Sequence, residues 1–267
     1  MTKTKRSTER LLGPFDPLPV GVRNGTLYSP FLLICDHAGN AVPKALNGLG
    51  LPRSELDRHI GIDIGILGVS EVLADLLGAP LVFQRYSRLV VECNRLNASP
   101  DSIAMISDGT SVPRNVGIDD IDRNLRVNEI AAPYHNEIAC RLDQRAAANI
   151  PTVLLSMHSF TPSLLARPSN RPWHVGLCYD ADVRFTSHVL AAIEKMPDIN
   201  VGRNEPYGVD MSRDYSIPVH AEARKIPYAE FELRQDLIST ATGQKSWGER
   251  LAAVVHEAYV AYGRAHS

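Results

Sequence analysis

Two apolar runs of the sequence lead directly into a histidine. The run at residues 31–35 continues into Asp36 and His37, and the run at residues 152–157 continues into His158. Each run is short and unbroken, which is typical of a buried β-strand. Ligand sites of open α/β sheets collect at the carboxyl ends of strands, and neutral imidazole is a common zinc ligand. The pair therefore predicts a metal site, and two strand-end histidines bonded to nearby backbone are the simpler alternative.

A catalytic zinc site typically has three protein ligands and leaves one position for water. Asp63 is the first candidate for the third ligand. His59 precedes it by four residues, so on a helix the two side chains would share a face, one binding metal and the other orienting a ligand or contacting substrate. Asp36 is another candidate, either as a ligand or as a partner of His37. An exposed helix surface that carries His59 and Asp63 is the alternative.

The segment at residues 228–234 alternates in polarity and supplies a candidate general base. Its alternation places Glu230, Glu232 and Arg234 on one face of a strand. Charged residues on a covered sheet are costly unless they lie at a site. Glu232 is suited to take a proton from water and return it to a leaving amine, and Arg234 to bind a carboxylate. An edge strand with a solvated polar face is the alternative.

Several other polar residues are candidates for substrate binding or catalysis. Arg88 precedes an expected strand at residues 89–93, and Asn94 and Arg95 follow it. Side chains at the carboxyl end of this strand would reach the same cleft as the two histidines, and guanidinium groups suit planar anions. Strand-flanking arginines that face solvent are the alternative. His220 is a further candidate.

The expected elements alternate along the chain. Strands are expected over residues 31–36, 79–83, 89–93, 152–157, 174–179, 200–202 and 228–233, and helices over residues 53–78, 119–148, 185–195, 217–224 and 245–264. This alternation predicts a three-layer α/β/α domain over residues 13–267, with a flexible tail at residues 1–12. The tight connection between residues 81–83 and 89–93 predicts an antiparallel pair and hence a mixed sheet. Residues 96–118 are expected to form a long, functional loop.

Composition and charge exclude several function classes. The 267 residues carry a formal net charge of -2, which argues against nucleic-acid or anionic-membrane partners. No apolar stretch reaches the roughly 18 residues of a membrane span, and the basic start lacks the apolar core of a secretory signal. The four cysteines are widely spaced, as expected in a reducing cytoplasm. Motifs for a nucleophilic serine or a nucleotide phosphate are missing from the sequence.

Eight segments of the chain carry a resemblance to a known family. They are residues 34–40 with 42–43, 59–65, 86–95, 133–135, 157–162, 204–207, 220–222 and 231–238. In this order they resemble the N-formylglutamate amidohydrolase family, over most of the chain. The resemblance leads us to expect aspartate in many relatives at the position of Glu92.

The resemblance implies a zinc-dependent amidohydrolase that acts on linear amides rather than peptide bonds. It implies a three-layer fold similar to zinc exopeptidases (phosphorylase/hydrolase-like) and the conversion of N-formyl-L-glutamate to formate and L-glutamate, a step of histidine degradation. The partner would be a small anionic N-acyl amino acid.

The order of the site residues is also similar to that of zinc-dependent cell-wall amidases. Those enzymes have a strand-end histidine, an acid that opens a helix, a second strand-end histidine and a late glutamate. This parallel favours Asp63 over His59 as the third Zn²⁺ ligand beside His37 and His158. Glu232 is expected to move the proton, and catalytic roles of His59 and His220 are expected in orienting a ligand or stabilising the oxyanion. Substrate-binding roles are expected for Arg88, Asn94, Arg95 and Arg234.

Two alternatives to N-formylglutamate hydrolysis follow from the sequence. The first is an amidase for another N-acyl amino acid or for a peptidoglycan fragment, with residues 96–118 as the lid that decides substrate size. The second is a non-catalytic small-molecule binding protein on the same fold, because fold alone does not fix function.

Overall fold

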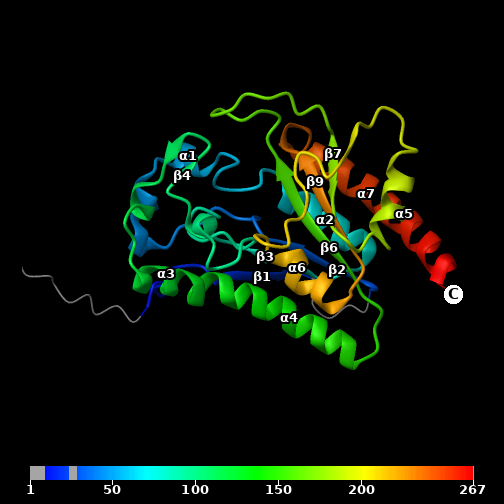
Figure 1. Cartoon of the computed structure of the whole chain (residues 1–267), viewed down its shortest axis with the longest axis horizontal. Helices are drawn as coiled ribbons and strands as arrows, with labels where there is room; N and C mark the ends of the chain where they lie inside the picture. Colours follow the sequence, from blue (N-terminus) through cyan, green and yellow to red (C-terminus); the bar gives the residue numbers. More distant parts are fainter. Residues whose placement is uncertain (1–9, 24–28, 267) are drawn as a thin grey trace, which may run out of the picture.

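The computed structural model describes residues 10–23 and 29–266 of the chain. A seven-stranded sheet with the order β1-β3-β2-β6-β9-β7-β8 runs through its centre (Figure 1). The strands are β1 (Val20–Arg23), β2 (Phe31–Cys35), β3 (Leu81–Gln84), β6 (Val153–Phe160), β7 (Val175–Cys178), β8 (Val201–Arg203) and β9 (Tyr228–Arg234). A small hairpin of β4 (Ile106–Ser107) and β5 (Thr110–Ser111) lies apart from this sheet.

Helices cover both faces of the sheet. The first face packs against α2 (Ile66–Leu77), α5 (Thr186–Ile193) and α7 (Ala241–His266). The second face packs against α4 (Ala132–Ala147) and α6 (Ser216–His220), while α1 (Arg53–Leu56) and α3 (Asp120–Arg126) are short. Figure 1 shows α4 and α7 on opposite sides of the strands. The predicted three-layer α/β/α class is confirmed.

Strand β2 shows why its sequence is apolar at every position. Leu33 and Cys35 face the cluster beneath α2 and α7, whereas Leu32 and Ile34 face the cluster beneath α4. Successive side chains of a strand point to opposite faces, so a strand covered on both sides needs a continuous apolar run. The same rule explains the buried run of β6.

The sheet is mixed, as predicted, but through other strand pairs. Strands β3, β2, β6 and β9 are parallel neighbours, while β1 and β7 run antiparallel to β3 and β9. The predicted strand at residues 89–93 is wrong, because this segment is a buried loop. Side chains bind its carbonyls: the Asn115 amide donates to Leu89 O at 2.9 Å, and Arg126 donates to Val90 O at 3.1 Å. An apolar run fixes burial but not strand pairing.

The predicted helix at residues 53–78 is also wrong in its middle. The chain leaves α1 after Leu56 and re-enters a helix only at Ile66. Gly65 adopts a left-handed φ of 79°, and a Cβ there would lie 2.0 Å from Ile238 O. This close approach requires glycine and turns the chain, so Asp63 lies in a turn and not on a helix face.

Other segments lie close to their predicted places. The helical stretch predicted at residues 119–148 contains α3, a π-helical turn (Val127–Ala131) and α4. Residues 96–118 hold the β4–β5 hairpin between short 3₁₀ turns at Pro100–Ile103 and Pro113–Asn115.

The chain is anchored earlier than the predicted tail at residues 1–12 suggests. Residues 1–9 lie outside the described residues. Leu11 is buried, and the backbone amides of Leu11 and Leu12 donate to the Glu129 carboxylate at 2.6 and 2.9 Å. The remaining 3₁₀ segments are Lys44–Gly50, Glu222–Arg224 and Gln235–Leu237. Within residues 10–23 and 29–266, no helix has both the length and the apolar character of a membrane span.

Candidate active site

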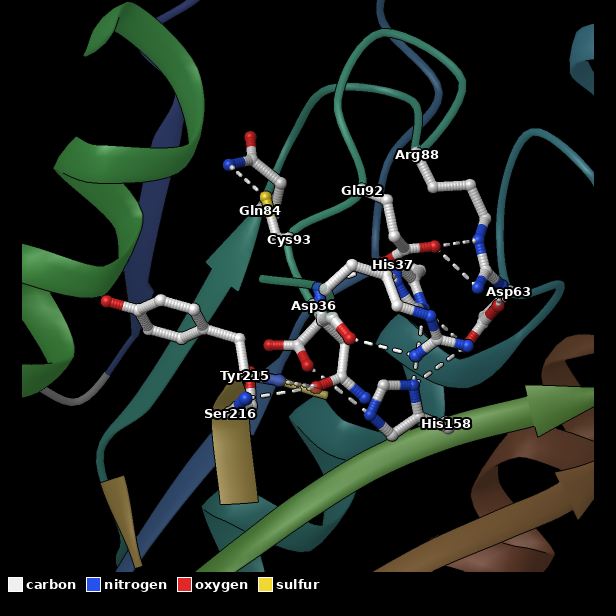
Figure 2. A network of polar contacts seen from close by, with 12 residues as sticks. Asp36, His37, Asp63, Gln84, Arg88, Glu92, Cys93, His158, Tyr215 and Ser216 are labelled. Atoms are coloured by element: carbon white, nitrogen blue, oxygen red, sulfur yellow. Dashed lines mark hydrogen bonds and ion pairs between the residues drawn. The ribbon is translucent and has the colours of Figure 1, made fainter. Parts of the chain in front are cut away.

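Three side chains meet in a triangle beside the central strands. His37 Nδ1, His158 Nδ1 and Asp63 Oδ2 lie 3.2 Å from one another on all three sides. Figure 2 shows the two rings and the carboxylate pointing toward a common centre. A zinc ion bound tetrahedrally at about 2.0–2.1 Å holds its ligand atoms about 3.3 Å apart. The spacing and the donor types therefore fit a divalent metal, and the three predicted ligands come together.

The backbone fixes the triangle as firmly as the side chains do. His37 lies in the turn after β2, and its carbonyl accepts a hydrogen bond of 3.0 Å from the Asp63 amide. His158 lies within β6, two residues before the strand ends, and not beyond the strand as predicted. The next amide, that of Ser159, donates to Asp63 Oδ2 at 3.2 Å. All three side chains are buried, so their geometry is held by the core.

An outer pair, Arg88 and Glu92, holds two of the triangle's members. The Glu92 carboxylate makes a short hydrogen bond with His37 Nε2, which leaves Nδ1 of that ring for the centre. Arg88 donates to Glu92 Oε2 at 2.7 Å and to Asp63 Oδ1 at 3.0 Å (Figure 2). Burial raises the pKa of Asp63, but His37 and Arg88 outweigh it and hold that pKa well below its usual value. Asp63 and Glu92 are therefore both ionised.

Asp36 supports His158 from the side away from the triangle. Its Oδ2 lies 3.5 Å from His158 Nε2, and its Oδ1 accepts a hydrogen bond of 2.6 Å from the Tyr134 hydroxyl. Ser156 Oγ lies 3.1 Å from the same ring nitrogen. Asp36 is thus placed as a partner of a candidate ligand and not among the three grouped atoms. A carboxylate behind a ligand histidine fixes its tautomer and ring orientation.

Glu232 and Glu230 bring two further carboxyl groups to the site. Glu232 pairs with His158 in the β6–β9 register, and its Oε2 has no hydrogen-bond partner among the described residues. Burial raises the pKa of Glu232 to about 8 and that of Glu230 to about 7. Strand β9 lies between β6 and β7, so the edge-strand alternative is wrong.

These groups open into a cavity of about 320 Å³. His37, His158 and Glu232 line it together with Arg88 and Tyr207. A buried, unpartnered carboxyl beside two imidazoles and a carboxylate is an arrangement for moving protons next to a bound metal.

Comparison with known proteins agrees with this geometry. The profile of the N-formylglutamate amidohydrolase family matches residues 29–239. The chain belongs to the N-formylglutamate amidohydrolase family. The match spans β2 to the 3₁₀ turn after β9, and therefore every residue of the triangle and its surroundings.

Two solved structures are similar to this N-formylglutamate amidohydrolase family member over nearly their whole length. The gene product Atu2144 from Agrobacterium tumefaciens is 30% identical, with a TM-score of 0.90 over 94% of this chain and 99% of that one. N-formylglutamate amidohydrolase from Ralstonia eutropha JMP134 is 17% identical, with a TM-score of 0.67 over 92% and 100%. The second likeness shows the fold. A comparison with curated proteins found no match.

Other predicted site residues of this family member also reach the cavity. His59 lines it, with Nε2 3.3 Å from Asp108 Oδ2, and burial lowers its pKa. His59 and Asp63 do not share a helix face, since both lie in the turn between α1 and α2. Asn94 also lines the cavity. Its Oδ1 accepts a hydrogen bond of 3.0 Å from the Ser216 amide, so its side chain holds the backbone at the start of α6.

Two predicted residues lie outside the cavity lining. His220 packs behind the site, with Nε2 3.1 Å from His135 Nδ1, and burial lowers its pKa to about 3. Its place behind the cavity suits the expected role of positioning other site groups. Arg234 donates to Asp236 at 2.8 Å and to Pro172 O at 3.3 Å. Its guanidinium is therefore bonded outside the cavity, and its predicted contact with a substrate carboxylate stays a prediction.

The structure adds residues for which the sequence suggested no role. Arg213 and Asp214 line the cavity together with Arg95. Arg95 forms a short ion pair with Asp214 and a longer one, of 3.4 Å, with Asp101. Arg213 also bonds to Asp101. These residues come from polar loops without periodicity, so no sequence pattern brings them together. Glu92 did carry a signal, as the one acid inside an apolar run.

Proposed function

We propose that this protein is a zinc-dependent amidohydrolase that cleaves the amide bond of an N-acyl amino acid, with N-formyl-L-glutamate as substrate. The carrying observation is the triangle of His37, Asp63 and His158 beside the unpartnered carboxyl of Glu232. The family's description and the name of the Ralstonia eutropha relative support this activity.

The triangle would hold the metal through two imidazole nitrogens and one carboxylate oxygen. Its spacing and donor set fit Zn²⁺, which in catalytic sites accepts imidazole nitrogens together with a carboxylate oxygen in a tetrahedral arrangement. When bound, Zn²⁺ supplies Lewis acidity that polarises the amide carbonyl and lowers the pKa of water. Arg88 and Glu92 keep Asp63 and His37 oriented for this role.

Glu232 moves the proton in the proposed reaction. Its ionised form accepts a proton from the attacking water, and its protonated form delivers that proton to the departing nitrogen as the C–N bond breaks. Water thereby adds to the acyl carbon, and the products are formate and L-glutamate. Burial favours the protonated form of Glu232, whereas the positive charges of His158 and Arg88 favour its ionised form. These opposed effects keep the carboxyl able to exchange its proton near neutral pH.

Guanidinium groups in the cavity are suited to the carboxylates of the substrate. Arg95 and Arg213 line the cavity but are already bonded to Asp214 and Asp101. A substrate carboxylate therefore competes with these acids. Burial raises the pKa of Asp214, while Arg95 lowers it.

The test is formate release from N-formyl-L-glutamate by the purified protein, after removal of metal with a chelator and reloading with Zn²⁺. We expect about one zinc per chain and turnover that depends on it. His158→Ala should lose both the zinc and the turnover, whereas His256→Ala, at an exposed position of α7, should keep both. Stoichiometric zinc in the His158→Ala protein would overturn the ligand assignment.

A further inference from the structure

A second cavity of about 370 Å³ lies next to the catalytic cavity. The two share His59, Arg88, Arg95 and Tyr207 among their lining residues. Arg88 donates directly to Asp63, so the shared wall lies at the edge of the ligand triangle. None of the three triangle residues lines the second cavity, so a substrate would reach it from the triangle past Arg88.

The second cavity is lined by both charged and apolar residues, and its apolar residues form the part that concerns a ligand chain. Its apolar lining residues are Ile60, Leu89, Ala104, Ile106, Leu164 and Ala166. They come from the α1–α2 turn, the buried loop before Cys93, the β4 region and the loop after β6. Ile106 is 68% exposed, so part of this apolar wall is open to solvent. Ligand pockets combine apolar side chains with a few polar groups, as this wall does.

Most charged residues on this wall are paired within the protein, and Arg167 is an exposed lining residue beside them. Asp108 accepts hydrogen bonds from the Ala166 and Leu165 amides at 2.9 and 3.0 Å, and Arg58 donates to it at 3.1 Å. Asp101 is bonded to Arg95 and Arg213. The β4–β5 hairpin and the loop after β6 are thereby fastened together around the cavity. Because these acids are already paired, the wall offers a ligand mainly apolar contacts.

We infer that the second cavity binds the acyl arm of the substrate, and that the protein accepts N-acyl amino acids with acyl groups of several carbons. The inference rests on the proposed amide hydrolysis and specifies its substrate class. With the amino acid in the catalytic cavity, a formyl group is a single carbon and leaves the second cavity unfilled. A longer acyl chain buries its methylenes against the apolar wall, which favours its binding.

The test is a series of N-acyl-L-glutamates with acetyl, butyryl and hexanoyl groups, assayed with the zinc-loaded enzyme beside N-formyl-L-glutamate. The wild-type kcat/KM for the hexanoyl substrate should exceed that for the acetyl substrate by about tenfold or more, since each buried methylene discriminates substantially. Acetyl is the reference because formyl amides differ in intrinsic reactivity. A flat or falling series would overturn the inference.

Two variants narrow the second cavity from different sides. Ala166→Phe projects from an exposed loop, and Ala104→Phe projects from the segment before β4. Either should lower the hexanoyl-to-acetyl ratio of kcat/KM by about tenfold. Ala147→Phe, at an exposed position of α4, is the matched control and should keep the wild-type ratio.

The outcomes separate the inference from the function on which it rests. Turnover of N-formyl-L-glutamate with no effect of acyl length, or an unchanged ratio in both folded Phe variants, overturns the acyl-arm inference alone. No turnover of any substrate in the series by the zinc-loaded protein overturns the proposed hydrolysis and the inference with it. A reduced ratio in one Phe variant and not in Ala147→Phe supports both.

Discussion

In each imidazole of the ligand triangle, one ring nitrogen faces the centre and the other contacts a neighbouring polar side chain. Nδ1 of His37 and Nδ1 of His158 face the centre, while the two Nε2 atoms face Glu92 and the Asp36–Ser156 pair. An acid behind a ring favours a proton on Nε2, which would leave the Nδ1 lone pair for a metal. Burial lowers the pKa of both rings, but the surrounding carboxylates outweigh it and raise that pKa, so a metal would have to displace a proton from Nδ1 when it binds.

At the residue scale, Glu232→Gln separates proton transfer from metal binding. The amide of glutamine keeps the size of the side chain but does not shuttle a proton. We expect kcat for N-formyl-L-glutamate to fall by about 10²–10⁴-fold, with zinc content unchanged. The control is Glu249→Gln, at an exposed position of α7, which should retain wild-type kcat. A Glu232→Gln enzyme with near-normal kcat would remove Glu232 from the mechanism.

Glu232 also gives the metal-free protein a pH-dependent stability. Its pKa rises from 4.5 to about 8 on burial, so between these values the folded state keeps a proton that the unfolded chain releases. The contribution to the free energy of unfolding is complete below pH 4.5. It declines as the pH rises and is lost above about pH 8.

This decline is measurable by urea unfolding of the chelator-treated protein. Glutamine does not ionise, so Glu232→Gln should lose less stability than wild type as the pH rises through this window. Between pH 4.5 and about 8, the free energy of unfolding of Glu232→Gln should therefore increase relative to that of wild type by a few kcal/mol. Parallel pH profiles would show that Glu232 is not buried in its protonated form.

The residue types of the site could be predicted from sequence more easily than its contacts. His37 and His158 stood out because each follows an apolar run. Asp63 was preferred over His59 mainly through the resemblance to zinc-dependent amidases. The outer partner Glu92 was visible as a residue, but its bond to His37 was not, because the two are joined only by the folded chain. Arg234 stood on the predicted face of its strand and still turned away toward Asp236, since the nearest acid competes for a guanidinium.

At the element scale, the turn between α1 and α2 decides where Asp63 lies. Gly65 and Gly78 flank α2, and both have positive φ values, of 79° and 57°. A Cβ on Gly65 would lie 2.0 Å from Ile238 O, whereas a Cβ on Gly78 would meet nothing within 4 Å. A side chain at Gly78 would meet only the cost of a positive φ, whereas a side chain at Gly65 would also clash with a neighbouring carbonyl.

Alanine substitutions at these two positions test this difference. Gly78→Ala should cost about 1 kcal/mol through its left-handed conformation alone. Gly65→Ala should cost at least about 2 kcal/mol more, because the backbone of the turn must also shift. Urea unfolding of the metal-free proteins gives both values. Equal losses would mean that the turn accommodates a side chain without moving.

Elements buried on both faces could be predicted well, and turns could not. The apolar runs of β2 and β6 are short and continuous, which suits a strand that is covered by helices on both faces. The run at residues 89–93 has the same composition, but Asn115 and Arg126 satisfy its backbone in place of a neighbouring strand. The stripe at residues 53–78 has helical periodicity, yet one close approach at Gly65 interrupts it. Both misses come from contacts with residues distant in sequence.

At the scale of the whole molecule, a metal bound at the triangle would link three segments that are distant in sequence. His37, Asp63 and His158 come from the end of β2, the turn before α2 and the strand β6. An ion that binds only the folded triangle stabilises the entire fold by mass action, by about 2.7 kcal/mol when free zinc is a hundred times its Kd. We expect Zn²⁺ to raise Tm and a chelator to reverse the rise.

Differential scanning calorimetry of three proteins checks this coupling. Wild type and His256→Ala should show the zinc-dependent rise in Tm, and His158→Ala should not. The same rise in His158→Ala would show that zinc stabilises the fold from another place.

The order of strands in the sheet has a consequence for how the protein is made. Strand β9 is the last strand in sequence, yet it lies between β6 and β7. A nascent chain that ends before Tyr228 therefore leaves β6 and β7 each with an unpaired edge facing a gap. Translation must deliver β9 into that gap before the sheet closes, and the same event brings Glu232 beside His158. A truncated chain is thus both inactive and prone to pair with its neighbours, so completion of synthesis, closure of the sheet and assembly of the active site coincide.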